Sequence, residues 1–293
     1  MKTYTAEIFS NEKYKLGESP FYDSRTKTIS WVDIPEGKLF TLEPDGKRRE
    51  YSYGQAIGSA LPADKIGSYL IAGTDGLYLQ LKDASSPKLI RKLSDYYESY
   101  QRSNDAKADP KGRLWFGSSV DDDEHEASGN LFCLDPYDGD KISVKQAGTK
   151  ISNGMAWSSD RKHFYFSDTL EHAVFSYDYD IESGSISNRR ILFRPEEGRG
   201  LTDGMCIDAD DNLWVAFWGG SRIEKRSAKD GSLLAVVNVD AKNVTSCCFI
   251  GDDLDTLFIT TSGRGQTGEH DGCLFTCRVD AKGCECDYCK INL

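Results

Sequence analysis

Short stretches of alternating apolar and polar residues run along the whole chain, and turns rich in Asp, Gly and Asn separate them. One unit, "DADDNLWVAFW", places an acidic turn directly before an aromatic strand, and "DPKGRLWFGS" shows the same arrangement earlier in the chain. A period of two is typical of half-buried β-strands, whereas an amphipathic helix needs a period of 3.6. The pattern therefore predicts an almost entirely β protein.

This unit of turn and strand recurs six times. The aromatic residues that mark the copies are Trp31, Tyr69, Trp115, Tyr165, Trp214 and Phe258, with separations of 38 to 50 residues. A second strand follows each marker, often opened by Gly and closed by a polar turn, as in "GKLFTLEPDGK". Hairpin repeats of this size are typical of β-propeller blades, so the sequence predicts an all-β, six-bladed β-propeller with a central channel, formed by residues 1–293 as a single domain. A large β-sandwich is the alternative, but it would not need one motif six times.

The two ends of the chain are candidates for closing the ring. We expect the N-terminal "TYTAEIF" to complete the last blade alongside the C-terminal "CDYCKINL". Cys284, Cys286 and Cys289 in the overlapping "CECDYC" also allow a structural zinc site, although the second half of the usual zinc pattern is missing. The alternative is a plain edge strand with free thiols.

Polar residues stand at matched offsets before the markers of four different copies. Glu18 lies 13 residues before Trp31, Asn153 lies 12 before Tyr165, and Asp203 lies 11 before Trp214; in another copy, Arg102 and Asn104 lie 13 and 11 before Trp115. Because the first strand of every blade lines the channel, these residues are predicted to converge there. Gly154 and Gly204, which follow two of them, would permit a close approach of backbone or ligand.

Two carboxylates and an amide form a set of oxygen donors. Such a set favours one hard divalent cation, Ca²⁺ first, with Mg²⁺, Mn²⁺ or Zn²⁺ as alternatives. Three protein ligands would leave positions open for water and substrate, as catalytic metals need. The other interpretation is that Glu18, Asn153 and Asp203 only cap strand ends or bind channel water.

Four motifs, in order along the chain, resemble those of a known family. "LGESPFYD", "RSNDAKADPKGRLWFGS", "ISNGMAWSSD" and "LTDGMCIDADDNLWVAFWGG" are similar to the regucalcin (senescence-marker-protein) and gluconolactonase family of six-bladed propellers. The resemblance implies a divalent metal held by Glu18, Asn153 and Asp203, with Asp203 also acting as catalytic proton donor and acceptor.

The same resemblance implies the substrate contacts. Arg102 and Asn104 match the family's substrate-binding pair in its "R-x-N-D" stretch, and the next contact, usually Glu in the family, falls on Asp122, with Asp121 as the rival. Either would be a shorter acid than the family's usual one, which leaves the shape of the substrate pocket open.

Three functions follow as hypotheses from this site. The first is a metal-dependent lactonase that hydrolyses a small-molecule sugar or aldonic lactone. The second is a phosphotriesterase-type hydrolase, because an open metal site would polarise a phosphoryl oxygen in the same way. The third is a non-enzymatic propeller that binds calcium or a partner.

Charge and hydropathy limit the partners and the cellular location that the sequence predicts. The formal net charge of −11 argues against nucleic acid as a partner. No window is apolar enough for a membrane span, and the N-terminus lacks the apolar run of a signal peptide. We therefore expect a cytoplasmic protein without a membrane partner whose nine cysteines are thiols.

Overall fold

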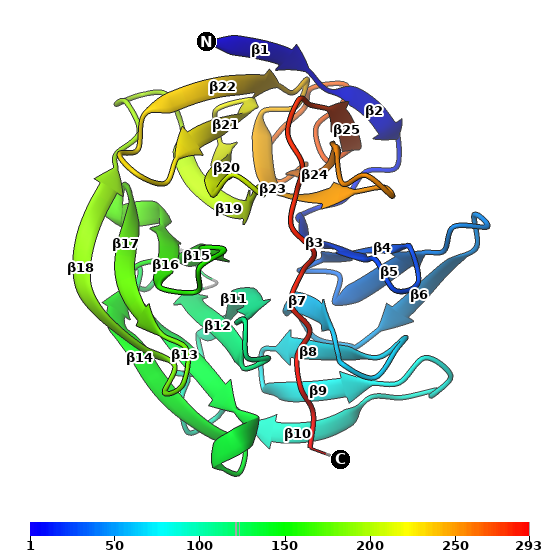
Figure 1. Ribbon diagram of the computed structural model, residues 1–293. Helices are drawn as coiled ribbons and strands as arrows, with labels where there is room; N and C mark the ends of the chain where they lie inside the picture. Colours follow the sequence, from blue (N-terminus) through cyan, green and yellow to red (C-terminus); the bar gives the residue numbers. More distant parts are fainter. Residues whose placement is uncertain (121, 123, 293) are drawn as a thin grey trace.

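A computed structural model describes residues 1–120, 122 and 124–292. The strands in this part of the chain form six sheets arranged around a central channel, as the ring in Figure 1 shows. Each sheet is one blade whose strands run from the channel outward. The predicted six-bladed propeller is therefore confirmed.

The first three blades each contain four strands that are consecutive in sequence and antiparallel. Blade 1 consists of β3 (Gly17–Asp23), β4 (Thr28–Asp33), β5 (Lys38–Leu42) and β6 (Arg48–Ser52). Blade 2 consists of β7 (Ile57–Pro62), β8 (Tyr69–Gly73), β9 (Gly76–Gln80) and β10 (Lys88–Lys92). Blade 3 consists of β11 (Gln101–Ala108), β12 (Leu114–Val120), β13 (Gly129–Asp135) and β14 (Lys141–Thr149), with the short 3₁₀-helix η1 (Pro136–Asp138) after β13.

The last three blades contain the strands that close the ring. Blade 4 consists of β15 (Ser152–Trp157), β16 (His163–Asp168), β17 (Ala173–Asp180) and β18 (Ser185–Phe193), with η2 (Thr169–Glu171) after β16. Blade 5 consists of β19 (Leu201–Ile207), β20 (Asn212–Trp218), β21 (Arg222–Ser227), β22 (Leu233–Asn238) and, at its outer edge, β1 (Lys2–Thr5). Blade 6 consists of β23 (Asn243–Ile250), β24 (Thr256–Ser262), β25 (Leu274–Arg278) and the outer strand β2 (Glu7–Ser10).

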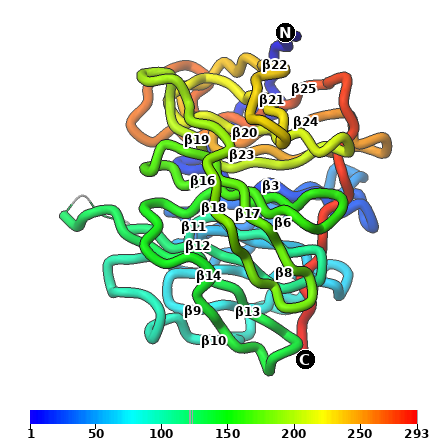
Figure 2. The backbone as a smooth tube through the Cα atoms, turned by 60° about the vertical axis from the view of Figure 1, so that its left-hand side comes forward, coloured from blue at the N-terminus to red at the C-terminus, as the bar shows by residue number. Residues whose placement is uncertain are grey.

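Ring closure differs in one respect from the sequence-based expectation. The N-terminal segment does complete the last blade, but β2 pairs with β25, and β1 pairs in parallel with β22 of the preceding blade. The C-terminal stretch "CDYCKINL" is not an edge strand. Instead it crosses one face of the ring, as the red segment of Figures 1 and 2 shows, and forms one isolated bridge between Ala63 and Cys289.

The predicted aromatic markers lie in the second strand of every blade, where they are buried. In blade 3, Asp109 accepts a hydrogen bond from the indole of Trp115 at 3.1 Å, and in blade 5, Asp208 accepts one from Trp214 at 3.0 Å. The acidic turn before each of these two tryptophans thus binds the indole that follows it. This pairing explains why "DPKGRLW" and "DADDNLW" have the same spacing.

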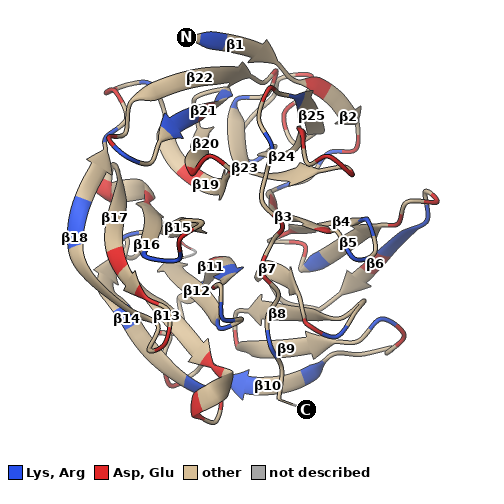
Figure 3. Cartoon of the chain, in the orientation of Figure 1, with Lys and Arg blue, Asp and Glu red and all other residues tan. Residues whose placement is uncertain are grey.

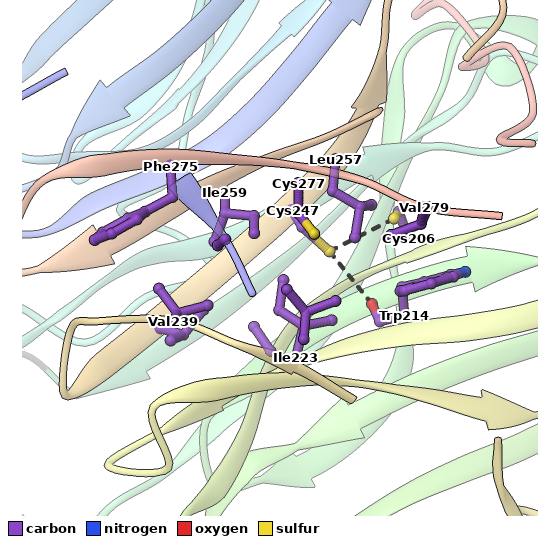
Figure 4. Packing of buried hydrophobic residues seen from close by; sticks show 14 of the residues in the cluster. Cys206, Trp214, Ile223, Val239, Cys247, Leu257, Ile259, Phe275, Cys277 and Val279 are labelled. Atoms are coloured by element: carbon purple, nitrogen blue, oxygen red, sulfur yellow. Dashed lines mark hydrogen bonds between the residues drawn. The ribbon is translucent and has the colours of Figure 1, made fainter. Parts of the chain in front are cut away.

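Apolar side chains pack between neighbouring blades. Between blades 5 and 6, a cluster that includes Trp214, Ile223, Val239, Leu257, Ile259 and Phe275 is almost fully buried, and Figure 4 shows these side chains meeting from both blades. The Sγ atoms of Cys206 and Cys247 lie 3.5 Å apart within it. Burial of each large apolar side chain stabilises the fold by roughly 1.5–3 kcal/mol. Charged residues lie mostly on outer strands and loops (Figure 3), and the inner strands β7, β15 and β23 carry none, although β11 carries Arg102, Asp105 and Lys107.

None of the helices in the described part of the chain is long and apolar enough to cross a membrane.

Candidate active site

The inner strands share a local irregularity that aims side chains into the channel. Their pairing with the second strand of the blade shifts register, and these shifts lie between Glu18 and Phe21, Ile57 and Ser59, Ser103 and Ala106, Ser152 and Met155, Thr202 and Met205, and Val244 and Ser246. A β-bulge breaks strict alternation and redirects a side chain. The predicted residues Glu18, Asn104, Asn153 and Asp203 all lie at these bulges.

The bulges bring the predicted residues together from four blades. Glu18, Arg102, Asn104, Asn153 and Asp203 line one cavity of about 470 Å³. Their side chains are only 5–7% exposed, so they lie in a setting of low polarity where charges interact strongly. The five predicted residues therefore converge in one cavity.

Small residues after the site residues allow the inner strands to approach one another. A Cβ on Gly154 would lie 2.8 Å from the backbone oxygen of Asp203, and a Cβ on Gly204 would lie 2.2 Å from Ser246 Oγ. Glu18 is followed by Ser19, which has a φ of 49° and whose backbone N–H donates to Glu18 Oε2 at 2.7 Å. The predicted close approach is thus one between neighbouring inner strands, to backbone at Gly154 and to a side chain at Gly204.

A chain of hydrogen bonds fixes the two amides. Arg102 Nη1 donates to Asn104 Oδ1 at 2.7 Å, and Asn104 Nδ2 donates to Asn153 Oδ1 at 3.0 Å. Asn153 Nδ2 donates in turn to Thr169 Oγ1 at 2.7 Å. Since an amide oxygen has two lone pairs, Asn153 Oδ1 keeps acceptor capacity beyond the bond from Asn104.

The buried acids repel one another. Burial raises the pKa of Glu18 well above its usual range, and the neighbouring Asp203 and Asp105 carboxylates raise it further. Burial and Asp105 likewise raise the pKa of Asp203, while the Arg102 guanidinium acts in the opposite direction on both acids. Without a cation, this cavity therefore favours protonated carboxyl groups.

Asp105 is a member of this acid cluster that the sequence-based argument missed. Burial raises its pKa, and the Lys107 ammonium two residues along β11 lowers it. Strict alternation would place adjacent residues Asn104 and Asp105 on opposite faces of a strand. The bulge between Ser103 and Ala106 removes that alternation, and an aspartate directly after Asn104 at the start of a blade is the signal in the sequence.

The remaining predicted contact, Asp122, lines the same cavity from its rim. Its carboxylate accepts hydrogen bonds from the backbone N–H groups of Glu124 and His125, each at 2.9 Å, and pairs with the His125 ring, which lowers the Asp122 pKa. The His125 ring in turn stacks on Tyr100 with centroids 3.8 Å apart. The rival Asp121 lies outside the described residues.

A metal site elsewhere in the described residues would need a group of ligand side chains placed close together. No group of three or more His, Cys, Asp or Glu side chains there is placed to hold a metal ion. The predicted set at the channel contains only two such side chains, Glu18 and Asp203, because its third member is the amide of Asn153. At the C-terminus, Cys289 is buried while Cys284 is exposed, and with Cys286 they form no such group.

Comparison with known proteins places this geometry in context. Residues 16–263 match the family model described as "SMP-30/Gluconolactonase/LRE-like region". Regucalcin of Xenopus laevis is 34% identical over 272 residues, which cover 91% of this chain and 89% of that protein. A Bacillus subtilis (strain 168) protein with the provisional name sugar lactone lactonase YvrE is 35% identical over 286 residues, covering 95% and 96%. The structure of a luciferin-regenerating enzyme superposes with a TM-score of 0.90 at 29% identity, covering 98% of this chain and all of that one.

Proposed function

The chain belongs to the SMP-30/gluconolactonase/LRE-like family, and on that premise we propose that it is a metal-dependent lactonase that hydrolyses sugar or aldonic acid lactones. The observation that supports this proposal is the convergence of Glu18, Asn153 and Asp203 with Arg102 and Asn104 in one buried cavity. The sugar lactone lactonase name of the Bacillus subtilis relative points to the same substrate class.

The donor set suits a hard divalent cation, Ca²⁺ in the first place. Burial raises the pKa values of Glu18 and Asp203, and the charge of the half-buried Asp105 raises both further, so a cation bound between Glu18 and Asp203 would relieve that repulsion. Glu18 and Asp203 would hold it through carboxylate oxygens and Asn153 through Oδ1, which are ligands that Ca²⁺ and Mg²⁺ prefer. Zn²⁺ and Mn²⁺ remain candidates because each accepts carboxylate oxygens. A cation bound there would supply Lewis-acid polarisation of the lactone carbonyl.

The side chains of the cavity divide the remaining work. Asp203 would accept a proton from the attacking water and return it to the ring oxygen that leaves as an alcohol. Arg102 would hold a hydroxyl group or the new carboxylate, and its bond to Asn104 orients both groups before substrate arrives.

The test is an assay of lactone hydrolysis in which the proton released by the new carboxylic acid is measured. We expect Asp203→Asn to lower kcat by at least ~100-fold while the protein remains folded, since general acid–base catalysis contributes roughly 10²–10⁴-fold. Asp210→Asn is the matched control, because Asp210 lies exposed in the turn after the same strand. Chelation should abolish turnover, and a panel of divalent cations should restore it. Full activity of the Asp203 variant would disprove the assignment.

The same experiment separates the two other hypotheses. A propeller that only binds calcium would bind metal without hydrolysing any lactone. A phosphotriesterase would hydrolyse an organophosphate ester faster than a lactone under identical conditions. The described structure contains no observation that favours either of these over the lactonase.

A further inference from the structure

A second hollow opens from the proposed active site. It has a volume of about 550 Å³ and shares four lining residues with the site cavity, namely Leu16, Ile34, Arg102 and Arg264. Its other walls come from residues 13–15 before β3 and residues 263–271 after β24. The two hollows are therefore continuous, and we call the second one the side groove.

Positive charge surrounds the side groove. Lys13, Lys15, Arg102 and Arg264 all line it. Arg102 is buried at the junction with the site, whereas Arg264 is exposed at the mouth. The backbone holds Arg264 in place, because its N–H donates to Ser262 Oγ at 3.0 Å and to the backbone oxygen of Lys15 at 3.1 Å.

Two acids near the groove offset part of this positive charge. Asp271 is the one acid among its described lining residues, and its carboxylate accepts backbone N–H bonds from Gly268 at 2.7 Å and Lys242 at 2.6 Å. Glu36 pairs with Lys15. Lys13 Nζ makes a long contact of 3.5 Å to the backbone oxygen of Gly268, and among the described residues no ion pair engages the side chain of Arg264.

This distribution of charge is the reverse of that in the site and in the chain as a whole. The site cavity is acidic at Glu18 and Asp203, and the protein carries a net charge of −11. Lys13 and Arg264 engage in no ion pair among the described residues, and their positive charge in such a protein creates a local field that attracts an anion. A molecule that spans both hollows would place an electrophilic carbonyl at the acids and an anionic group among the cations.

We infer that the preferred substrates are sugar lactones that carry an anionic group, a phosphate ester or a carboxylate, at the end of the molecule away from the reacting carbonyl. This inference rests on the proposed lactonase function and specifies its substrate class. Arg264 and Lys13 bind the anionic group, and Arg102 lies between it and the lactone ring. Guanidinium groups suit phosphate and carboxylate because their paired N–H groups match the oxygens of both.

The experiment compares three lactones: glucono-1,5-lactone, its 6-phosphate and a glucaric acid monolactone. In the wild-type protein, we expect kcat/KM for at least one anionic lactone to exceed that for the neutral lactone by about tenfold. Arg264→Gln and Lys13→Gln should each lower this preference by about three- to tenfold. Raising the salt concentration to about 0.5 M should reduce it as well, because exposed charges are screened.

The matched control is Arg190→Gln on the outer strand β18, whose side chain is 50% exposed and pairs with Asp178 far from the groove. It should leave the preference unchanged. The larger preference identifies phosphate or carboxylate as the group recognised. If the wild type hydrolyses all three lactones with equal kcat/KM, the inference is wrong and the lactonase function stands; if it hydrolyses none, both are wrong.

Discussion

At the scale of one residue, ionisation of the buried Glu18 carboxyl group lowers the stability of the metal-free fold. Its pKa is raised mainly by burial and then by the carboxylates of Asp203 and Asp105. A carboxyl group with a raised pKa in the folded state contributes stability below its unfolded pKa of about 4.3, and this contribution is lost as the pH rises toward the folded value. The metal-free protein should therefore lose stability between about pH 4 and neutral pH through these acids.

The variant Glu18→Gln tests this statement. In chelator, its free energy of unfolding should equal that of the wild type near pH 4 and exceed it by roughly 1–3 kcal/mol near pH 7, where an unpaired buried charge is most costly. Saturating Ca²⁺ should reverse the order, because only the intact ligand set gains binding energy. Denaturant melts at both pH values, with the exposed Glu196→Gln as control, provide the measurement. A Gln variant less stable than the wild type in chelator at pH 7 would contradict it.

Most of the site could be predicted residue by residue, for a physical reason. Homologous positions of a ring repeat lie around one axis, so counting back from the aromatic markers sufficed to bring Glu18, Asn153 and Asp203 to one cavity. Asp105 was missed because counting back from Trp115 selects Arg102 and Asn104, and the bulge between Ser103 and Ala106 cannot be read from the spacing. The side groove could not be predicted either, because Lys13 and Arg264 lie on loops that no repeat pattern describes.

At the scale of a strand, the bulge and the glycine beside it act together. Gly204 lies directly against β23, and a Cβ there would approach Ser246 Oγ to 2.2 Å and Ser246 Cβ to 2.6 Å. Either β19 or β23 would have to move, and Asp203 is the adjacent residue. The glycine is thus a requirement of packing between blades 5 and 6.

Gly204→Ala is therefore expected to lower the free energy of unfolding by roughly 1–3 kcal/mol, as overpacking of a close contact does. Lactone hydrolysis should fall as well, since Asp203 would shift from its position. The double variant Gly204→Ala with Ser246→Gly removes the opposing side chain and should recover much of the stability. Additive effects of the two substitutions in chemical denaturation would show that the contact with Ser246 is not the cause.

At the scale of the whole molecule, closure of the ring could be predicted only in part. The need to close a propeller ring, rather than a residue pattern, identified the N-terminal segment as a partner of the last blade, and β2 does pair with β25. It did not predict that the segment divides, with β1 on blade 5, because an edge strand accepts either neighbour. The C-terminal stretch also alternates, yet its backbone bonds go to turns of several blades.

The C-terminal segment ties distant blades together across the end of the channel opposite the site. The backbone N–H of Cys289 donates to Pro62 O at 3.1 Å, and that of Lys290 donates to Gly112 O at 2.9 Å, which engages blades 2 and 3. At its start, Gly283 N–H donates to Leu254 O of blade 6 at 2.7 Å. The segment also covers a cavity of about 250 Å³ lined by Phe21 and Trp157.

A chain that ends at residue 282 should therefore fold but melt roughly 5–10 °C lower, since several hydrogen bonds of about 1 kcal/mol each and the cover of an apolar cavity are lost. Lactone turnover at 25 °C should persist, because the residues around Asp203 lie at the other end of the inner strands. A chain that ends at residue 290 keeps the three backbone bonds to Pro62, Gly112 and Leu254 and serves as control. If the shorter chain keeps its melting temperature but loses turnover, the segment supports the site rather than the ring, because its contacts with the inner strands would then be positioning Asp203.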